Sequence, residues 1–487
     1  MPQRCRMMLA ALPLAALLLA GIVLGAAALL RGPEYDEGYT AFVTGTNPRP
    51  DWPATPSLAG DMRPAFRPAP TPWAIAGNLR RTDVHPPLYF WLIWAWRHAF
   101  GPDLLASRLL SVLCSLGSLA LVLALARAAE VPALPALALT LGCYGFVETG
   151  ITARGYALAQ ALQLAGLLVS LRARNGRQAA GAGLLLGAAS FTNYLAAFPA
   201  AAAALWLLRR RWRLGLWLVA GLLPLVAGDA FFFWAQKGSR VGQFPPFAWG
   251  GFARALAQSL GGAVLGGLPR YLPAGGGRLG VGGLLGLLLA LMLLLPLLRW
   301  RRIGAAGPRA LLALAALGTP CGLLLMALAA HSTPVELRYL AFALPPFALL
   351  LAGAIGSFAQ PWRGALLGLV LGVQALSIAG LMIAPATMQP EGAAARMAAR
   401  AAGARGLVLL PRGNDGVGIV GAFLTAAPAG LHILLVRPGE APARLQPLIA
   451  RFPCVTAPPL AVDDASRATL PLIRLMLHRN RNCIDGS

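Results

Sequence analysis

Long apolar runs, separated by short clusters of arginine, repeat along almost the whole chain. Many of these runs approach the roughly 20 residues that a helix needs to cross a bilayer. Only 12% of the 487 residues are charged, whereas a soluble globular protein carries about 25%. The pattern predicts an all-α polytopic membrane protein and excludes an ordinary soluble domain.

The net charge of +24 comes from 41 Lys and Arg residues against 17 Asp and Glu residues. These cations stand in bursts between apolar runs, which is the positive-inside pattern of membrane topology and not a nucleic-acid surface. With residues 7–30 as the first span and the N-terminus in the cytoplasm, the pattern predicts about eleven transmembrane helices. The first loop and the C-terminal region then lie outside the cytoplasm.

Two parts of this topology depend on short apolar segments. If residues 86–100 crossed the bilayer, the later arginine clusters would fall outside, so we expect an interfacial helix there, anchored by Trp91, Trp94 and Trp96. Residues 178–208 are expected to form two short helices around a turn at 191–194.

The last hundred residues differ in character from the rest. Residues 406–411 and 431–437 are typical of buried strands, each followed by a helix-like stretch, and residues 412–416 indicate a turn. We therefore expect a transmembrane domain over 1–387, including an extracytoplasmic first loop with juxtamembrane helices at 31–100, and a small α/β domain over 388–487. Cys454 and Cys483 would be able to pair in an oxidising compartment.

Polar residues that face outward on this topology are few. Two adjacent acids, Asp36 and Glu37, stand at the start of the first loop. The later positions are His85, Arg108, Glu148, Arg154, Tyr156, Asn193, Tyr194, Lys237, Arg240, Arg338 and Tyr339. A carboxylate opposite several arginines suits a reaction in which a base deprotonates a hydroxyl while cations hold a phosphate leaving group. Arginine favours this task because its planar fork pairs phosphate oxygens bidentately.

Each position also has a purely structural interpretation. Asp36 and Glu37 would fit a solvated helix end, Glu148 and Arg154 a local ion pair, and His85 a helix cap. Tyrosines at span ends, such as Tyr156 and Tyr194, often contact lipid headgroups, and the Arg338–Tyr339 pair would fit the same role. Lys237 and Arg240 are typical of solvated loop charges. A single function explains all these positions together, whereas the structural interpretation needs a separate reason for each.

The order of five motifs, YDEGYTA, DVHPPLYFWLIWAWRHAFG, LLASRLL, ETGITARGYALA and ELRYLAFALPP, resembles the membrane glycosyltransferases of family 39. The resemblance covers roughly residues 7–390. This family includes the protein O-mannosyltransferases and the bacterial lipid A aminoarabinose transferases, which share the GT-C fold.

The resemblance implies an inverting transfer of one sugar from a polyprenyl-monophosphate carrier. Asp36 matches the general base and Glu37 its companion, and His85 matches the position that approaches the carrier phosphate. Basic positions that line the same cavity are matched by Arg108, Arg154 and Arg338. Two departures follow: the aminoarabinose enzymes have Lys at the His85 position, and the loop at 235–278 is too short for the luminal domain of the protein mannosyltransferases.

The sequence therefore predicts a glycosyltransferase of the cytoplasmic membrane whose active site faces the periplasm or the outside. Its acceptor would be a hydroxyl of a glycolipid or cell-envelope glycan, with catalysis by Asp36 and Glu37. Substrate would be bound by His85, Arg108, Glu148, Arg154, Tyr156, Tyr194, Arg338 and Tyr339. A divalent cation is possible, but no obligatory metal or cofactor is expected. The alternative is a transporter or flippase of a lipid-linked sugar, which would call for inverted repeats and broken helices near the bilayer midplane.

Overall fold

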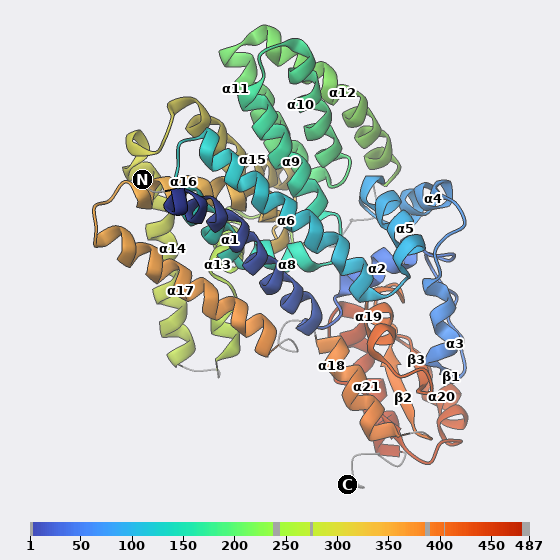
Figure 1. Ribbon diagram of the computed structural model, residues 1–487. Coiled ribbons are helices and arrows are strands. Elements are labelled where there is room, and N and C mark those ends of the chain that lie inside the picture. Colours follow the sequence, from blue (N-terminus) through green and yellow to red (C-terminus); the bar gives the residue numbers. More distant parts are fainter. Residues whose placement is uncertain (1–2, 237–243, 273–275, 385–389, 404, 480–487) are drawn as a thin grey trace. The chain divides into compact units, whose positions relative to one another are not determined.

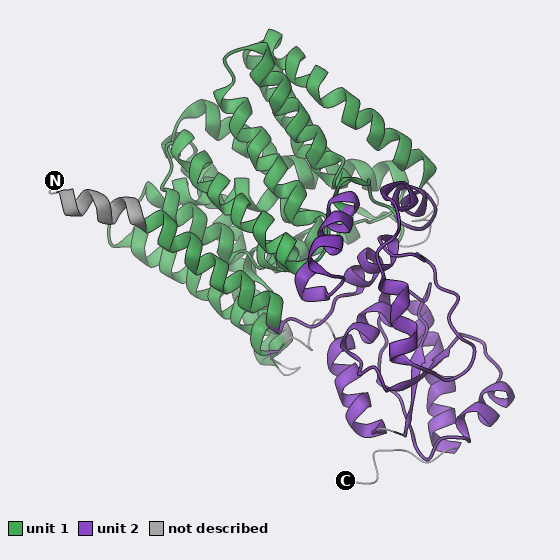
Figure 2. Cartoon of the chain, turned by 45° about the vertical axis from the view of Figure 1, so that its right-hand side comes forward, with its two compact units in different colours: residues 1–29, 84–89, 108–383 green, residues 30–83, 90–107, 384–487 purple. Residues whose placement is uncertain are grey.

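The computed structural model describes residues 3–236, 244–272, 276–384, 390–403 and 405–479 (Figure 1). Three residues of the sequence analysis, Lys237, Arg240 and Cys483, lie outside these ranges. The chain divides into two compact units, coloured green and purple in Figure 2. The first comprises residues 1–29, 84–89 and 108–383, and the second comprises residues 30–83, 90–107 and 384–487. Each unit is described separately.

The first unit is helical. It holds most of α1 (Gln3–Leu30) and α6 (Leu104–Ala128), then α7 (Ala133–Gly142), α8 (Tyr144–Ile151), α9 (Tyr156–Arg172), α10 (Gly176–Ser190), α11 (Ala197–Arg210), α12 (Trp212–Ala235), α13 (Trp249–Leu265), α14 (Gly276–Leu298), α15 (Ala306–Ala330), α16 (Leu344–Gly356) and α17 (Trp362–Ile383). Short 3-10 helices include η2 (Tyr194–Ala196), η3 (Leu268–Tyr271), η4 (Trp300–Arg302) and η5 (Leu337–Ala343).

Seven helices among the described residues are long and apolar enough to span a membrane. The count becomes eight if α7 and α8, which meet at a 69° bend, form one broken span. The polytopic helical fold is therefore confirmed. The sequence predicted about eleven spans because it also counted α9, α10 and α11 as spanning helices. These three helices are only 17, 15 and 14 residues long.

The two short helices expected between 178 and 208 are present as α10 and α11, joined through η2. Helix α10 packs closely on α12 because glycines meet at the crossing. A Cβ on Gly183 would stand 2.0 Å from the carbonyl oxygen of Leu218, and a Cβ on Gly221 would stand 2.1 Å from that of Ala180. Only residues without a side chain permit this approach, so the two glycines fix the distance between the helices.

The second unit is a small α/β structure that includes most of the first loop. From the loop come α2 (Tyr35–Val43), β1 (Ser57–Leu58), α3 (Ala59–Met62), η1 (Arg63–Phe66), α4 (Pro72–Thr82) and most of α5 (Leu88–Phe100). The C-terminal region adds α18 (Pro390–Ala402), β2 (Leu407–Pro411), α19 (Gly418–Ala426), β3 (His432–Val436), α20 (Pro442–Ile449), β4 (Val455–Thr456) and α21 (Asp464–Arg479).

The sheet of this unit has the order β1-β3-β2-β4. Strands β2 and β3 are parallel, as are β2 and β4, and both predicted strands are buried. The small C-terminal α/β fold is thus confirmed. The sequence did not predict that β1 of the first loop pairs antiparallel with β3, with Ser57 opposite Ile433. Cys454 is disulfide-bonded, and its expected partner Cys483 lies outside the described residues.

Helix α5 is the segment for which an interfacial helix was expected. Its indole N–H groups donate to backbone carbonyls, from Trp91 to Pro72 at 3.0 Å, from Trp94 to Ala69 at 2.6 Å and from Trp96 to Ala106 at 2.8 Å. These bonds hold α5 to neighbouring segments of the second unit, because buried or half-buried indoles seek an acceptor. The position of α5 at a membrane interface stays a prediction.

Candidate active site

Helix α2 carries the predicted catalytic acids and begins with a capping box. Glu34 is the N-cap residue, and its backbone N–H donates to Oε2 of Glu37 at 2.9 Å. Glu37 is only 5% exposed, so its carboxylate has a structural task at the helix start. Asp36 is half-buried in the same turn. Of the two acids, Asp36 is therefore the better candidate for a reacting group.

Helix α2 also contacts the C-terminal part of the second unit. Gly38 lies so close to α19 that a Cβ on Gly421 would stand 2.9 Å from its Cα atom. The hydroxyl of Tyr39 donates to the carboxylate of Asp415, a residue of the predicted turn before α19. The carboxylate also accepts from the backbone N–H of Val417 at 2.9 Å. Contacts from one turn of α2 thus fix the helix that bears Asp36.

Arg49 completes this cluster from the middle of the first loop. Its guanidinium stands 3.3 Å from Oδ2 of Asp415 and donates to the carbonyl of Thr82 at 2.6 Å. It also lies over the ring of Tyr39, 5.4 Å from the centroid. Arg49 therefore ties together α2, the end of α4 and the turn at 412–416, all within the second unit.

This environment raises the pKa of two tyrosines of α2, Tyr35 and Tyr39. Their rings lie 5.4 Å apart, and burial followed by the negative charge of Asp415 raises the pKa of both Tyr35 and Tyr39 above the ordinary tyrosine value. Both effects disfavour the phenolate. Tyr39 consequently stays a protonated donor to Asp415 throughout the physiological pH range.

In the first unit, two of the predicted phosphate-binding residues are in contact. Nη2 of Arg154 lies 3.1 Å from Nδ1 of His85. Because a guanidinium can only donate, Nδ1 of the imidazole accepts and its proton resides on Nε2. An imidazole and a guanidinium that is only 3% exposed therefore lie side by side. Such a pair is suited to bind phosphate oxygens.

Gln236 connects His85 to Tyr194. Its amide Nε2 donates to the carbonyl oxygen of His85 at 3.0 Å, while its Oε1 accepts from the Tyr194 hydroxyl at 2.9 Å. The backbone N–H of Leu88 donates to the carbonyl of Phe191 at 3.2 Å. The His-Pro-Pro segment is thus attached to the turn between α10 and α11, and three sequence-predicted residues belong to one hydrogen-bonded group.

A neighbouring group surrounds α9. Tyr156 is the first residue of α9 and lies 6.4 Å from Phe342, ring to ring, while Gln160 donates to the carbonyl of Ala341 at 2.7 Å. These contacts fasten η5, which carries Arg338 and Tyr339, to the helix that follows Arg154. Arg338 forms an ion pair with Glu336 at 2.6 Å and lies 5.8 Å over the Tyr339 ring.

Two further predicted residues make contacts with the backbone. Nη1 of Arg108 donates to the carbonyl of Ala28 at 2.7 Å, so this buried guanidinium caps the last turn of α1. Glu148 is half-buried in α8, where its backbone carbonyl accepts from the Thr152 hydroxyl at 2.7 Å. For both residues a role in substrate binding stays a prediction.

Sequence reasoning missed Gln236, Arg49 and Asp415 as members of these clusters. Asp415 was noted only as part of a turn, and Arg49 lies in a Pro-rich loop without periodicity. Gln236 directly precedes the long loop and has no motif around it. No signal short of the three-dimensional contacts would have selected them.

Comparison with known protein families supports the predicted resemblance. Residues 84–233 match the family described as dolichyl-phosphate-mannose-protein mannosyltransferase. The matched segment includes His85, Arg108, Glu148, Arg154 and Tyr194. A comparison with curated protein sequences gave no match.

The fold is similar to that of one solved structure. The crystal structure of ArnT from Cupriavidus metallidurans bound to undecaprenyl phosphate has a TM-score of 0.53 and 12% sequence identity, and the alignment covers 88% of each chain. The structure of the same ArnT in the apo state has a TM-score of 0.46 and 13% sequence identity. The alignment covers 88% of this chain and 86% of the ArnT chain. The crystal structure of the Archaeoglobus fulgidus oligosaccharyltransferase in complex with Zn and sulfate has a TM-score of 0.34 and 13% sequence identity. The alignment covers 85% of this chain and 57% of the oligosaccharyltransferase chain.

The fold and the long apolar helices define a class: the chain is a multi-pass integral membrane protein with a fold similar to that of ArnT. Within that class, the similarity to the dolichyl-phosphate-mannose-protein mannosyltransferase family extends over residues 84–233 of the 487.

Proposed function

We propose that the chain is an inverting glycosyltransferase that moves one sugar from a polyprenyl monophosphate to a hydroxyl of a glycolipid or cell-envelope glycan. The contact between His85 and Arg154 carries the proposal, because it presents two phosphate-binding groups within the family-matched residues. The ArnT structure with undecaprenyl phosphate supports a carrier lipid of this kind.

In the proposed reaction, Asp36 accepts the proton of the acceptor hydroxyl while the hydroxyl oxygen attacks the anomeric carbon of the sugar. The bond from that carbon to the phosphate oxygen breaks, and polyprenyl phosphate leaves with the electron pair. Arg154 and Nε2–H of His85 stabilise the charge that develops on the phosphate. A single displacement inverts the anomeric configuration.

The remaining predicted residues are proposed to bind substrate, with Glu37 acting as the companion that holds the start of α2. They are Arg108, Glu148, Tyr156, Tyr194, Arg338 and Tyr339. We further propose that the reaction occurs on the outer face of the cytoplasmic membrane. The transmembrane domain would extend over residues 1–387 and the extracytoplasmic α/β domain over residues 388–487.

The test is reconstitution of the purified protein in liposomes with a panel of polyprenyl-phosphate sugars, comparing wild type with Asp36→Asn and Arg154→Ala. Release of free polyprenyl phosphate by wild type, with loss in Asp36→Asn, is the expected result. Because Asn has almost the shape of Asp but cannot accept the proton, the loss would report chemistry and not packing. Full activity after chelation of divalent cations is also expected.

A flippase would give a different result in the same experiment. Intact donor would cross the bilayer, no polyprenyl phosphate would be released, and Asp36→Asn would behave as wild type. That outcome would replace the proposed reaction by transport. Reversible loss of activity on chelation would instead show that a metal takes part.

A further inference from the structure

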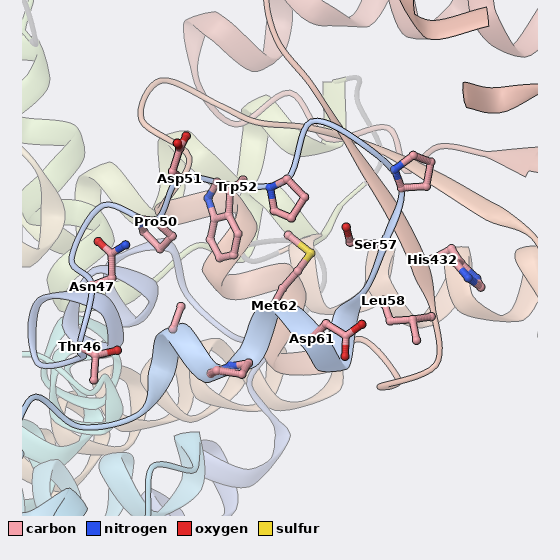
Figure 3. A pocket seen from close by; sticks show the side chains of 14 residues that line it. Thr46, Asn47, Pro50, Asp51, Trp52, Ser57, Leu58, Asp61, Met62 and His432 are labelled. Atoms are coloured by element: carbon pink, nitrogen blue, oxygen red, sulfur yellow. The ribbon is translucent and has the colours of Figure 1, made fainter. Parts of the chain in front are cut away.

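A cavity of about 580 Å³ lies within the second unit, between residues 46–65 of the first loop and strand β3 (Figure 3). Its lining includes Asn47, Asp51, Trp52, Ser57, Asp61 and His432. In the view of Figure 3, Asn47 and Asp51 lie on one side, Ser57 and Asp61 on the other, and Trp52 and Met62 between them. None of the residues assigned above to phosphate binding or catalysis lines this cavity.

The cavity is acidic although the chain as a whole has a net charge of +24. Two carboxylates, Asp51 and Asp61, line it, and the described residues of its lining include no lysine or arginine. The nearby arginines are directed to other partners. Arg49 contacts Asp415 and Thr82, and Arg63 donates to the carbonyls of Leu424, at 3.2 Å, and Ala427. An anionic ligand such as the donor phosphate would be repelled here.

The remaining chemistry of the lining suits a sugar. Carboxylate, amide and hydroxyl groups of Asp51, Asp61, Asn47 and Ser57 accept or donate hydrogen bonds to hydroxyls. Apolar side chains between them, including several prolines, Met62 and Trp52, suit the C–H faces of a pyranose ring. The lining thus combines polar groups that would fix the orientation of a ligand with apolar side chains that would contact it.

Hydrogen bonds, ring contacts and strand pairing hold the walls of the cavity in place. The indole N–H of Trp52 donates to the carbonyl of Gly416 at 2.6 Å, and its ring meets Phe42 edge-on at 5.6 Å. Ser57 and Leu58 are fixed by pairing with β3. Phe42 belongs to α2, the helix of Asp36, and Gly416 adjoins Asp415, which binds Tyr39 of the same helix. Cavity and catalytic helix therefore share one packed core.

We propose that this cavity binds an uncharged sugar unit of the acceptor glycan, an inference that rests on the proposed transferase function. Asp51 and Asp61 accept hydrogen bonds from its hydroxyls, and the acidic lining excludes phosphorylated sugars. Through Trp52, the site couples recognition of the acceptor to the helix that carries the proposed base.

The test measures sugar binding alone, without any donor. Full-length protein in nanodiscs is titrated with gluco-, manno- and galacto-configured neutral trisaccharides by saturation-transfer NMR, with inorganic phosphate as a competitor. Asp51→Asn and Asp61→Asn are compared with Asp464→Asn, which alters a carboxylate whose side chain is 91% exposed and does not belong to the lining. Ser57→Trp provides a second approach by filling the cavity.

The expected result is binding of at least one trisaccharide, weakened about tenfold by each pocket variant because a charged acceptor is lost. Trisaccharide binding is unchanged in Asp464→Asn and is unchanged when inorganic phosphate is added. Absence of binding by every trisaccharide, equal binding by Ser57→Trp, or competition by phosphate would each overturn the inference. Failure of the transferase proposal has a separate sign, namely no release of polyprenyl phosphate by wild type even where sugars bind.

Discussion

The hydroxyl of Tyr39 donates a hydrogen bond to the carboxylate of Asp415, a residue 376 positions later in the sequence. Tyr39 stands three residues after Asp36 on α2, and Asp415 stands in the turn that precedes α19. The bond therefore joins the proposed catalytic helix to the C-terminal region, inside the second unit. It gives this region a part in positioning Asp36.

Removing the Asp415 carboxylate is expected to lower transferase activity. Asp415→Ala removes the carboxylate that accepts from the Tyr39 hydroxyl and pairs with Arg49, which keeps its bond to Thr82, so we expect activity to fall about tenfold. Release of polyprenyl phosphate measures the change, and Asp464→Ala, at an exposed carboxylate, serves as the control. In a double-mutant cycle, Tyr39→Phe should add little to Asp415→Ala. Additive losses would show that the two residues act separately.

Alkaline pH should destabilise the protein partly through Tyr39. Burial and Asp415 raise the pKa of Tyr39 above its ordinary value of about 10. The raised pKa contributes stability that is complete below about pH 10 and is lost as the pH rises towards the folded-state pKa. Melting temperatures from pH 8 to 11 should fall more steeply for wild type than for Tyr39→Phe. If the melting temperatures of wild type and Tyr39→Phe fell equally with pH, groups other than Tyr39 would account for the loss of stability at alkaline pH.

Much of the helical architecture followed from the sequence, because apolar length and arginine placement are local signals. The short helices α10 and α11 and the strands β2 and β3 were predicted in this way. The pairing of β1 with β3 was not, since a strand of two residues leaves no periodicity to detect. Long-range register has no local signature.

The candidate site shows the same division. Motif order pointed to His85 and Arg154, and the structure brings them into contact. It also shows Glu37 in a capping box and Arg108 on a backbone carbonyl, roles that the motif did not predict. The acidic cavity escaped sequence reasoning because its walls come from a Pro-rich loop and a strand far apart in the chain.

Gln236 should support donor binding through His85 and Tyr194. Gln236→Leu removes both hydrogen bonds, so we expect the KM for the donor to rise about tenfold, whereas Tyr194→Phe removes one and should raise it about threefold. Gln258→Leu, at an exposed position of α13, is the matched control. An effect of Gln236→Leu no larger than that of Tyr194→Phe would argue against a link to His85.

The glycine contact between α10 and α12 should be intolerant of a single methyl group. Gly221→Ala places a Cβ 2.1 Å from the backbone oxygen of Ala180, which cannot move without displacing the helix. We expect the free energy of unfolding to fall by about 1–3 kcal/mol. Gly282→Ala in α14 has no heavy atom within 4 Å of its Cβ and should leave stability equal or slightly higher. Thermal unfolding in detergent compares the two, and equal melting temperatures would contradict the close packing.

Glu391 should act as a buried acid that costs stability at neutral pH. It is 2% exposed at the start of α18, and burial raises the pKa of its carboxyl although Arg31 opposes the shift. Because the folded-state pKa lies above the unfolded value, the protein loses stability as the pH rises between the two. Glu391→Gln mimics the protonated form, so its melting temperature should exceed that of wild type at pH 8. At about pH 3, well below the ordinary glutamate pKa, wild type is protonated in both states and the difference should largely vanish. A variant that is less stable than wild type at pH 8 would show that the charged form is favoured, with Arg31 outweighing burial.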